Sequence, residues 1–73
     1  MSWNYRVVSK TYPNGEIELH IHEAYYKSKR HKKPNSITEN PVTVGTDSIK
    51  GMRWILKMMS EALKKTILKY EDF

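Results

Sequence analysis

The dipeptide Asn14-Gly15 is the feature that most constrains the fold of this chain. It separates two segments, residues 3–12 and 16–26, that are rich in aromatic and β-branched residues, and the second alternates apolar with polar side chains. Asn-Gly readily adopts the positive φ angles that a tight turn between antiparallel strands requires. The sequence therefore predicts a β-hairpin over residues 3–26.

The turn also predicts which side chains share a face of the hairpin. If Asn14 and Gly15 alone form the loop, Tyr12 faces Ile17 and Arg6 faces Glu23. The expected core face then carries Val8, Tyr12, Ile17, Leu19, Ile21 and Tyr25. The opposite face carries Trp3, Tyr5, Val7, Ala24 and Tyr26, with His20 and His22. A bulge in the turn would shift this register by one residue.

The rest of the chain predicts one helix and little further sheet. Residues 27–35 lack apolar side chains and are expected to form a solvated basic loop. Residues 36–44 are typical of a weak strand, because the proline at position 41 removes a donor from the ladder. Helical spacing follows over residues 48–65, with Ser48 as the best N-cap. Its expected core stripe comprises Ile49, Met52, Leu56, Met59 and Leu63, with Ile55 and Ala62 beside them.

These elements define one domain of the α+β class. An antiparallel hairpin and a weak third strand should pack on one C-terminal amphipathic helix, followed by a short extended tail over residues 66–73. A chain of 73 residues buries only roughly 60% of the surface that its unfolded form exposes, so self-association is one route to added stability.

The composition excludes several classes of protein. The chain has no cysteine, so neither a disulfide nor a thiolate ligand is available. No apolar run approaches the roughly 20 residues of a membrane span, and the first residues do not resemble an export signal. We therefore expect a cytoplasmic protein without a membrane segment. The formal net charge of +5 favours acidic partners, although charge of this size also serves solubility alone.

Several stretches together carry a resemblance to a known group of sequences. They read WNYRVV, PNGE, IHEAYY, SITENPV, RWILKMMSEAL and ILKYEDF, and they span almost the whole chain. This pattern resembles a group of short uncharacterised bacterial and phage-associated proteins. The group has no established activity, so the resemblance implies no catalytic or binding residue. Members of the group usually have an acidic or neutral loop and an acidic helix, whereas both are basic here. The order of strands and helix is also similar to half of a HicB-type antitoxin, without its Pro-Gly-rich signature.

The basic residues are the strongest functional signal. Those proposed to contact phosphate groups or an acidic protein are Lys27, Lys29, Arg30, Lys32, Lys33, Lys50, Arg53 and Lys57. If loop and helix face the same way, they form one positive surface on which nearby aromatic rings stack against bases. The alternative is a solvated charge run without a ligand.

A protein-interaction surface is the competing hypothesis. Its candidate residues are Trp3, Tyr5, Tyr26, Trp54 and Met58, and its first expected use is a symmetric homodimer with a regulatory role. The same side chains could instead be covered by the C-terminal tail.

Catalytic, metal and cofactor sites are not expected. His20 and His22 point to the same face of a strand, with Glu18 beside them. A structural zinc site requires four ligands, and the one remaining histidine, His31, lies in the loop. No phosphate-binding glycine loop or nucleophile motif is present, and the chain is too short for a deep pocket of its own. The sequence therefore favours a small binding protein over an enzyme.

Overall fold

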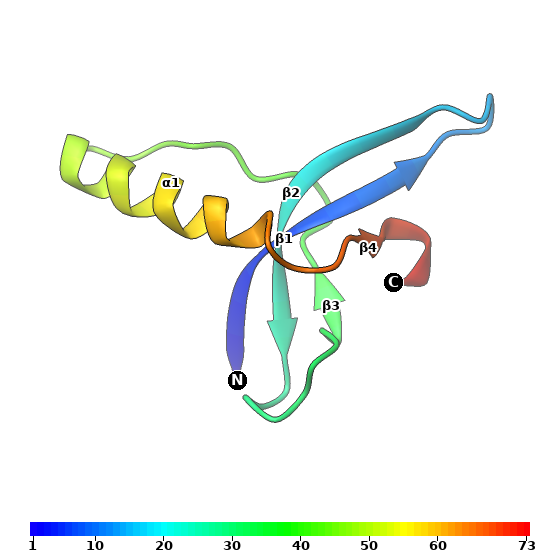
Figure 1. Cartoon of the computed structure of the whole chain (residues 1–73), viewed down its shortest axis with the longest axis horizontal. Coiled ribbons are helices and arrows are strands. Elements are labelled where there is room, and N and C mark those ends of the chain that lie inside the picture. The colour runs from blue at the N-terminus through cyan, green and yellow to red at the C-terminus, as the bar shows by residue number, and fades with distance from the viewer.

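One curled mixed sheet of four strands, with a single α-helix on one side, makes up the fold (Figure 1). The computed structural model describes residues 1–73. Its elements are β1 (Ser2–Thr11), β2 (Ile17–Tyr26), β3 (Ser36–Ile37), α1 (Ile49–Ala62), β4 (Leu68–Lys69) and the 3-10 helix η1 (Tyr70–Asp72). The strand order is β3-β2-β1-β4, in which only β4 runs parallel to its neighbour. The predicted α+β class, with a hairpin packed on one helix, is confirmed.

The hairpin turn differs from the predicted two-residue loop. The Tyr12 amide donates to the Glu16 carbonyl at 2.8 Å, and the Gly15 amide donates to the Tyr12 carbonyl at 2.8 Å. The loop is therefore the three residues 13–15, and only Gly15 takes a positive φ, of 87°. A turn followed by a left-handed glycine is the usual three-residue hairpin connection, and its bulge moves the register by one residue.

This shift makes the predicted face assignment of β1 wrong. Val8 lies opposite His20, and Arg6 lies opposite His22 instead of Glu23. Because side chains alternate along a strand, a slip of one residue moves every β1 side chain to the other face. Trp3, Tyr5 and Val7 consequently share a face with Ile21, and Val8 shares the opposite face with Ala24.

The core under α1 is built from residues of β1 and the C-terminal half of the helix. Tyr5 and Val7 pack with Met59 and Ala62, and the surrounding partly buried side chains are Ile21, Val42, Ile55 and Met58. Ser48 is the N-cap, as predicted, and accepts a hydrogen bond from the Gly51 amide at 3.0 Å.

The predicted core stripe of α1 is only partly correct. Ile49, Leu56 and Leu63 are exposed instead of buried. Ile49 is exposed because the N-terminal half of α1 projects beyond the sheet and has no strand beneath it (Figure 1). Leu56 and Leu63 each follow a residue that packs in the core, Ile55 and Ala62, so they lie about 100° around the helix from that contact. The helix also ends at Ala62, before the predicted boundary at residue 65.

The opposite face of the sheet is covered by the C-terminal segment. The buried residues there are Arg6, Val8, His22, Ala24 and Tyr26. The Tyr70 ring lies 6.0 Å from that of His22, and its hydroxyl donates to the Glu39 carbonyl at 3.3 Å. The C-terminal segment thus spans this face from β4 to the residues that follow β3. The predicted weak strand, β3, is only two residues long.

Candidate nucleic-acid interface

Two adjoining clefts lie where the basic loop meets the segment between α1 and β4. The first, the loop cleft, has a volume of about 400 Å³, and its side chains include Trp3, Arg6, Lys29, His31, Lys32 and Lys65. The second, the tail cleft, has a volume of about 570 Å³, and its charged side chains are Arg6, Lys32, Lys33, Lys69 and Asp72. Arg6, Lys32 and Thr66 line both. No carboxylate side chain lines the loop cleft, so its potential is positive.

Arg6 is the buried charge shared by both clefts. Its side chain is 5% exposed, and its Nη1 donates to the Tyr26 hydroxyl at 2.9 Å. Its Nη2 donates to the Thr66 carbonyl at 2.6 Å and to the Thr66 Oγ1 at 2.9 Å. The Tyr26 hydroxyl in turn donates to Asn4 Oδ1 at 2.9 Å. These bonds fix the guanidinium between β2 and the segment that leads into β4.

No carboxylate balances the charge of Arg6. The ion pairs of the molecule are Lys64 with Glu61 and, when the imidazole is protonated, His20 with Glu18. The Arg6 Nε is buried without a hydrogen-bond partner. Burying a charge without an opposite charge is unfavourable, so this group stands out from the rest of the molecule.

The basic loop is exposed but closed by hydrogen bonds. The Lys27 amide donates to Asn35 Oδ1 at 2.8 Å, and the Asn35 amide donates to the Tyr25 carbonyl at 2.8 Å. Ser28 Oγ and His31 Nδ1 share a hydrogen bond of 2.9 Å inside the loop. This closure holds the lysines of the loop near the clefts.

The predicted basic residues are divided by the structure. Lys29, Lys32 and Lys33 line the clefts, whereas Lys27 and Arg30 line neither. The helix residues Lys50, Arg53 and Lys57 are exposed on α1 and line no cleft either.

Three cationic residues of the clefts were absent from the predicted set. Lys65 and Lys69 belong to the chain after α1, where no local pattern marked them. Arg6 was expected to pair with Glu23, and the one-residue shift of the turn removes that pair. Placing Arg6 here requires both the three-residue loop and the pairing of β4 with β1, which brings Thr66 beside it.

The predicted aromatic surface is not a single surface. Tyr5 and Tyr26 are buried on opposite faces of the sheet, which follows from the corrected register. Met58 packs partly against the core. Trp3 and Trp54 remain 45% and 53% exposed, and the Trp3 ring lies edge-on to Tyr5 with centroids 5.2 Å apart. Trp3 is therefore the one aromatic side chain of this set that is both exposed and beside the loop cleft.

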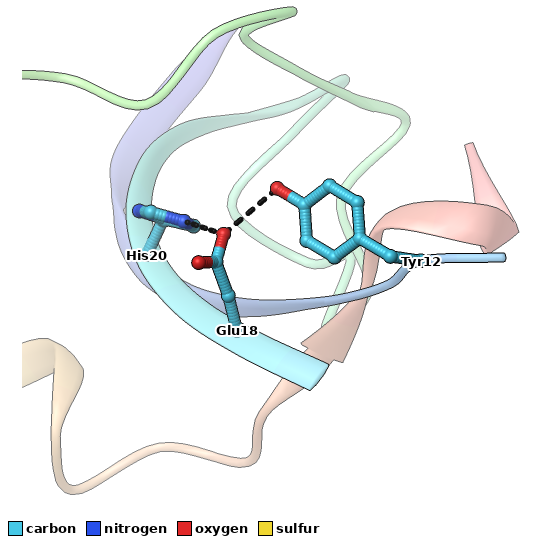
Figure 2. A network of polar contacts seen from close by, with 3 residues as sticks. All are labelled: Tyr12, Glu18 and His20. Carbon is cyan, nitrogen blue, oxygen red and sulfur yellow. Dashed lines mark hydrogen bonds and ion pairs between the residues drawn. The ribbon is translucent and has the colours of Figure 1, made fainter. Parts of the chain in front are cut away.

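The histidines of β2 make hydrogen bonds within the protein. His22 Nδ1 lies 2.9 Å from the Thr38 carbonyl, and His20 Nε2 lies 3.2 Å from Glu18 Oε1. Tyr12 donates its hydroxyl to the same Glu18 oxygen at 2.8 Å, as Figure 2 shows. The hydrogen bond from Tyr12, followed by that from His20, lowers the pKa of the Glu18 carboxyl. No three His, Asp or Glu side chains form a group suited to a metal ion.

Two findings concern the whole chain: the absence of a membrane-spanning helix and the absence of a match to known proteins. No helix has the length and the apolar character needed to cross a membrane. Comparison with protein-family models, with curated proteins and with solved structures gave no match for this chain.

Proposed function

We propose that this protein binds nucleic acid, with phosphate groups of the backbone held in the loop cleft. The observation that carries the proposal is the lining of that cleft, in which Arg6, Lys29, Lys32 and Lys65 come together without a carboxylate. Lysine and arginine supply most of the affinity for a phosphate backbone, and their contacts do not depend on base sequence. Trp3 at the same cleft offers a flat ring on which an unpaired base stacks.

The test compares two triple variants that remove the same number of positive charges. In the first, Lys29, Lys32 and Lys65 are changed to Ala; in the second, Lys50, Arg53 and Lys57 on α1 are changed to Ala. Binding of short fluorescent DNA and RNA, single-stranded and duplex, is followed by anisotropy over a range of salt concentrations. The native protein should bind with an affinity that falls steeply with salt.

The two variants should behave differently. The cleft variant should lose most of the affinity and reduce the slope of log K against log salt by about two to three. The helix variant should retain most of both. Equal losses would mean that net charge alone drives binding, and absence of binding at low salt would defeat the proposal. Polyglutamate serves as the competitor that represents an acidic protein, and it should displace the oligonucleotide poorly.

A second candidate function is self-association through α1. The apolar side chains Ile49, Leu56 and Leu63 are exposed on the helix, and Ile17 and Leu19 are uncovered on the same side of the sheet. A second copy suits this surface because each chain offers both parts, so the helix of one copy can cover the hairpin of the other reciprocally. Light scattering at increasing concentration tests this candidate. The native chain should form dimers that Leu56→Glu abolishes, and a native monomer throughout would rule the candidate out.

A further inference from the structure

The uncompensated charge of Arg6 points to a more specific ligand than a nucleic-acid backbone in general. A guanidinium has five N–H groups, and the three hydrogen bonds of Arg6 go to Tyr26 and Thr66. All three acceptors are neutral oxygens, and the Nε hydrogen has no acceptor. The structure therefore supplies hydrogen bonds that position this group without supplying its counter-ion.

We propose that the counter-ion is a terminal phosphate, a phosphate monoester bound in the loop cleft between Arg6, Lys29, Lys32 and Lys65. This inference rests on the proposed function and names the part of the ligand that the cleft holds. A monoester carries close to two negative charges at neutral pH, whereas a backbone diester carries one. Four cationic side chains with no carboxylate around one cleft match the more highly charged group.

The size and the rim of the cleft agree with a nucleotide as the end group. The loop cleft is shallow and open, and its volume of about 400 Å³ leaves room for a group larger than an inorganic anion. The exposed Trp3 side chain lines the same cleft, so a base attached to the phosphate has a ring to stack on. The ligand would be a free mononucleotide or the phosphorylated end of a strand.

Binding at this position should also stabilise the C-terminal segment. Arg6 holds Thr66 through two hydrogen bonds, and Lys65 beside it lines the loop cleft. An anion that contacts both Arg6 and Lys65 connects β1 to the segment that leads into β4. A ligand that binds only the folded state raises the apparent stability in proportion to the logarithm of its concentration.

The first experiment measures thermal unfolding of the native chain with small ligands at constant ionic strength. The additions are inorganic phosphate, a nucleoside, and the same nucleoside with a 5′ or a 3′ monophosphate, each compared with chloride. The mononucleotide should raise Tm, with a shift that grows with the logarithm of its concentration, phosphate should do so more weakly, and the nucleoside and chloride should not. Equal effects of mononucleotide and chloride would overturn the inference.

The second experiment uses one oligonucleotide with a 5′ phosphate, a 3′ phosphate or neither. One phosphorylated end should bind about tenfold or more tightly, as expected for a charge-assisted contact to a buried guanidinium. If all three bind equally, the proposed function stands and the inference fails. If mononucleotides shift Tm while no oligonucleotide binds, the terminal-phosphate site stands and nucleic-acid binding fails.

Two variants connect these effects to the cleft. Arg6→Met removes the buried charge and should abolish the mononucleotide shift. Lys65→Ala alters an exposed residue, so it keeps the test valid if Arg6→Met does not fold, and it should weaken mononucleotide binding several-fold. Arg53→Ala on α1 is the control and should bind like the native chain. An undiminished preference for the phosphorylated end in Lys65→Ala would contradict the assignment.

Discussion

Gly15 is the residue on which the pairing of β1 with β2 depends, since it alone has a positive φ angle. An L-residue with a side chain pays about 1–2 kcal/mol in that conformation. Gly15→Ala should therefore lower the free energy of unfolding by about that amount in urea titrations. Gly45→Ala is the matched control, because Gly45 has an ordinary φ and open space around it. It should be neutral or slightly stabilising. Equal effects of the two substitutions would contradict the role of the turn.

The Tyr12–Glu18 contact gives a second prediction for a single residue. The Tyr12 hydrogen bond is the main cause of the lowered pKa of Glu18, and the same bond raises the pKa of Tyr12. Tyr12→Phe should raise the pKa of Glu18 toward its ordinary value, measured by NMR titration of the side-chain carboxyl. Tyr25→Phe is the control and should leave Glu18 unchanged, because Tyr25 donates to Glu23 instead.

The sign of the associated pH dependence follows from the lowered pKa. A carboxyl whose pKa is lower in the folded state stabilises the fold above its unfolded pKa, and this contribution is lost as the pH falls through the folded pKa. The stability difference between native protein and Tyr12→Phe should therefore be present near neutral pH and vanish in acid. A difference that persists in acid would point to packing as its source.

At the scale of the element, the N-terminus of α1 depends on its cap because the sheet does not support it. Ser48 accepts from the Gly51 amide at 3.0 Å, while Ile49 is largely exposed. Ser48→Ala should cost about 1 kcal/mol of stability and reduce the helical signal in circular dichroism. Ser60→Ala serves as control in the same helix, since Ser60 is exposed and only donates to the Lys57 carbonyl. A larger cost for Ser60→Ala would contradict the capping argument.

Local signals predicted the elements, and contacts distant in sequence decided their faces. Asn-Gly and the alternation of β2 gave the hairpin, and Ser48 gave the start of α1. The register depended on whether the loop had two or three residues. Both loop lengths are common in hairpins, so the Asn-Gly dipeptide alone does not choose between them. For this reason Arg6 was expected opposite Glu23, whereas it lies opposite His22. The lysines of the loop were recognised from their number, but their meeting with the C-terminal segment depends on the parallel pairing of β4 with β1, which has no local signature.

At the scale of the whole molecule, two small cores lie on the two faces of one sheet. One lies under α1 and includes Val7 and Met59, while the other lies under the C-terminal segment and includes the fully buried Val8. A chain of this length has a total stability of roughly 5–10 kcal/mol. Neither core is large enough to hold the fold alone, so the last residues of the chain are structural as well as part of the clefts.

Tyr70 connects the C-terminal segment to this second core. The Tyr70 ring packs against His22, and the Lys10 ammonium lies over it, 4.7 Å from the ring centroid. The Tyr70 hydroxyl donates a hydrogen bond to the Glu39 carbonyl. Tyr70→Ala should cost roughly 2 kcal/mol, since the ring is half-buried. Tyr70→Phe keeps both ring contacts and should cost about 0.5 kcal/mol. Chemical denaturation measures both.

Hydrogen exchange then separates a loose tail from a generally weakened fold. In Tyr70→Ala the amides of β4 should lose protection while those in the middle of β1 and β2 keep theirs, because local opening requires only the contacts of the tail. The clefts need Thr66 and Lys65 in place, so this variant should also bind anions more weakly, and saturating mononucleotide should restore part of the protection of β4. If β4 exchanges no faster in Tyr70→Ala than in Tyr70→Phe, the tail is held by the pairing of Leu68 with Val8, and Tyr70 is only a surface contact.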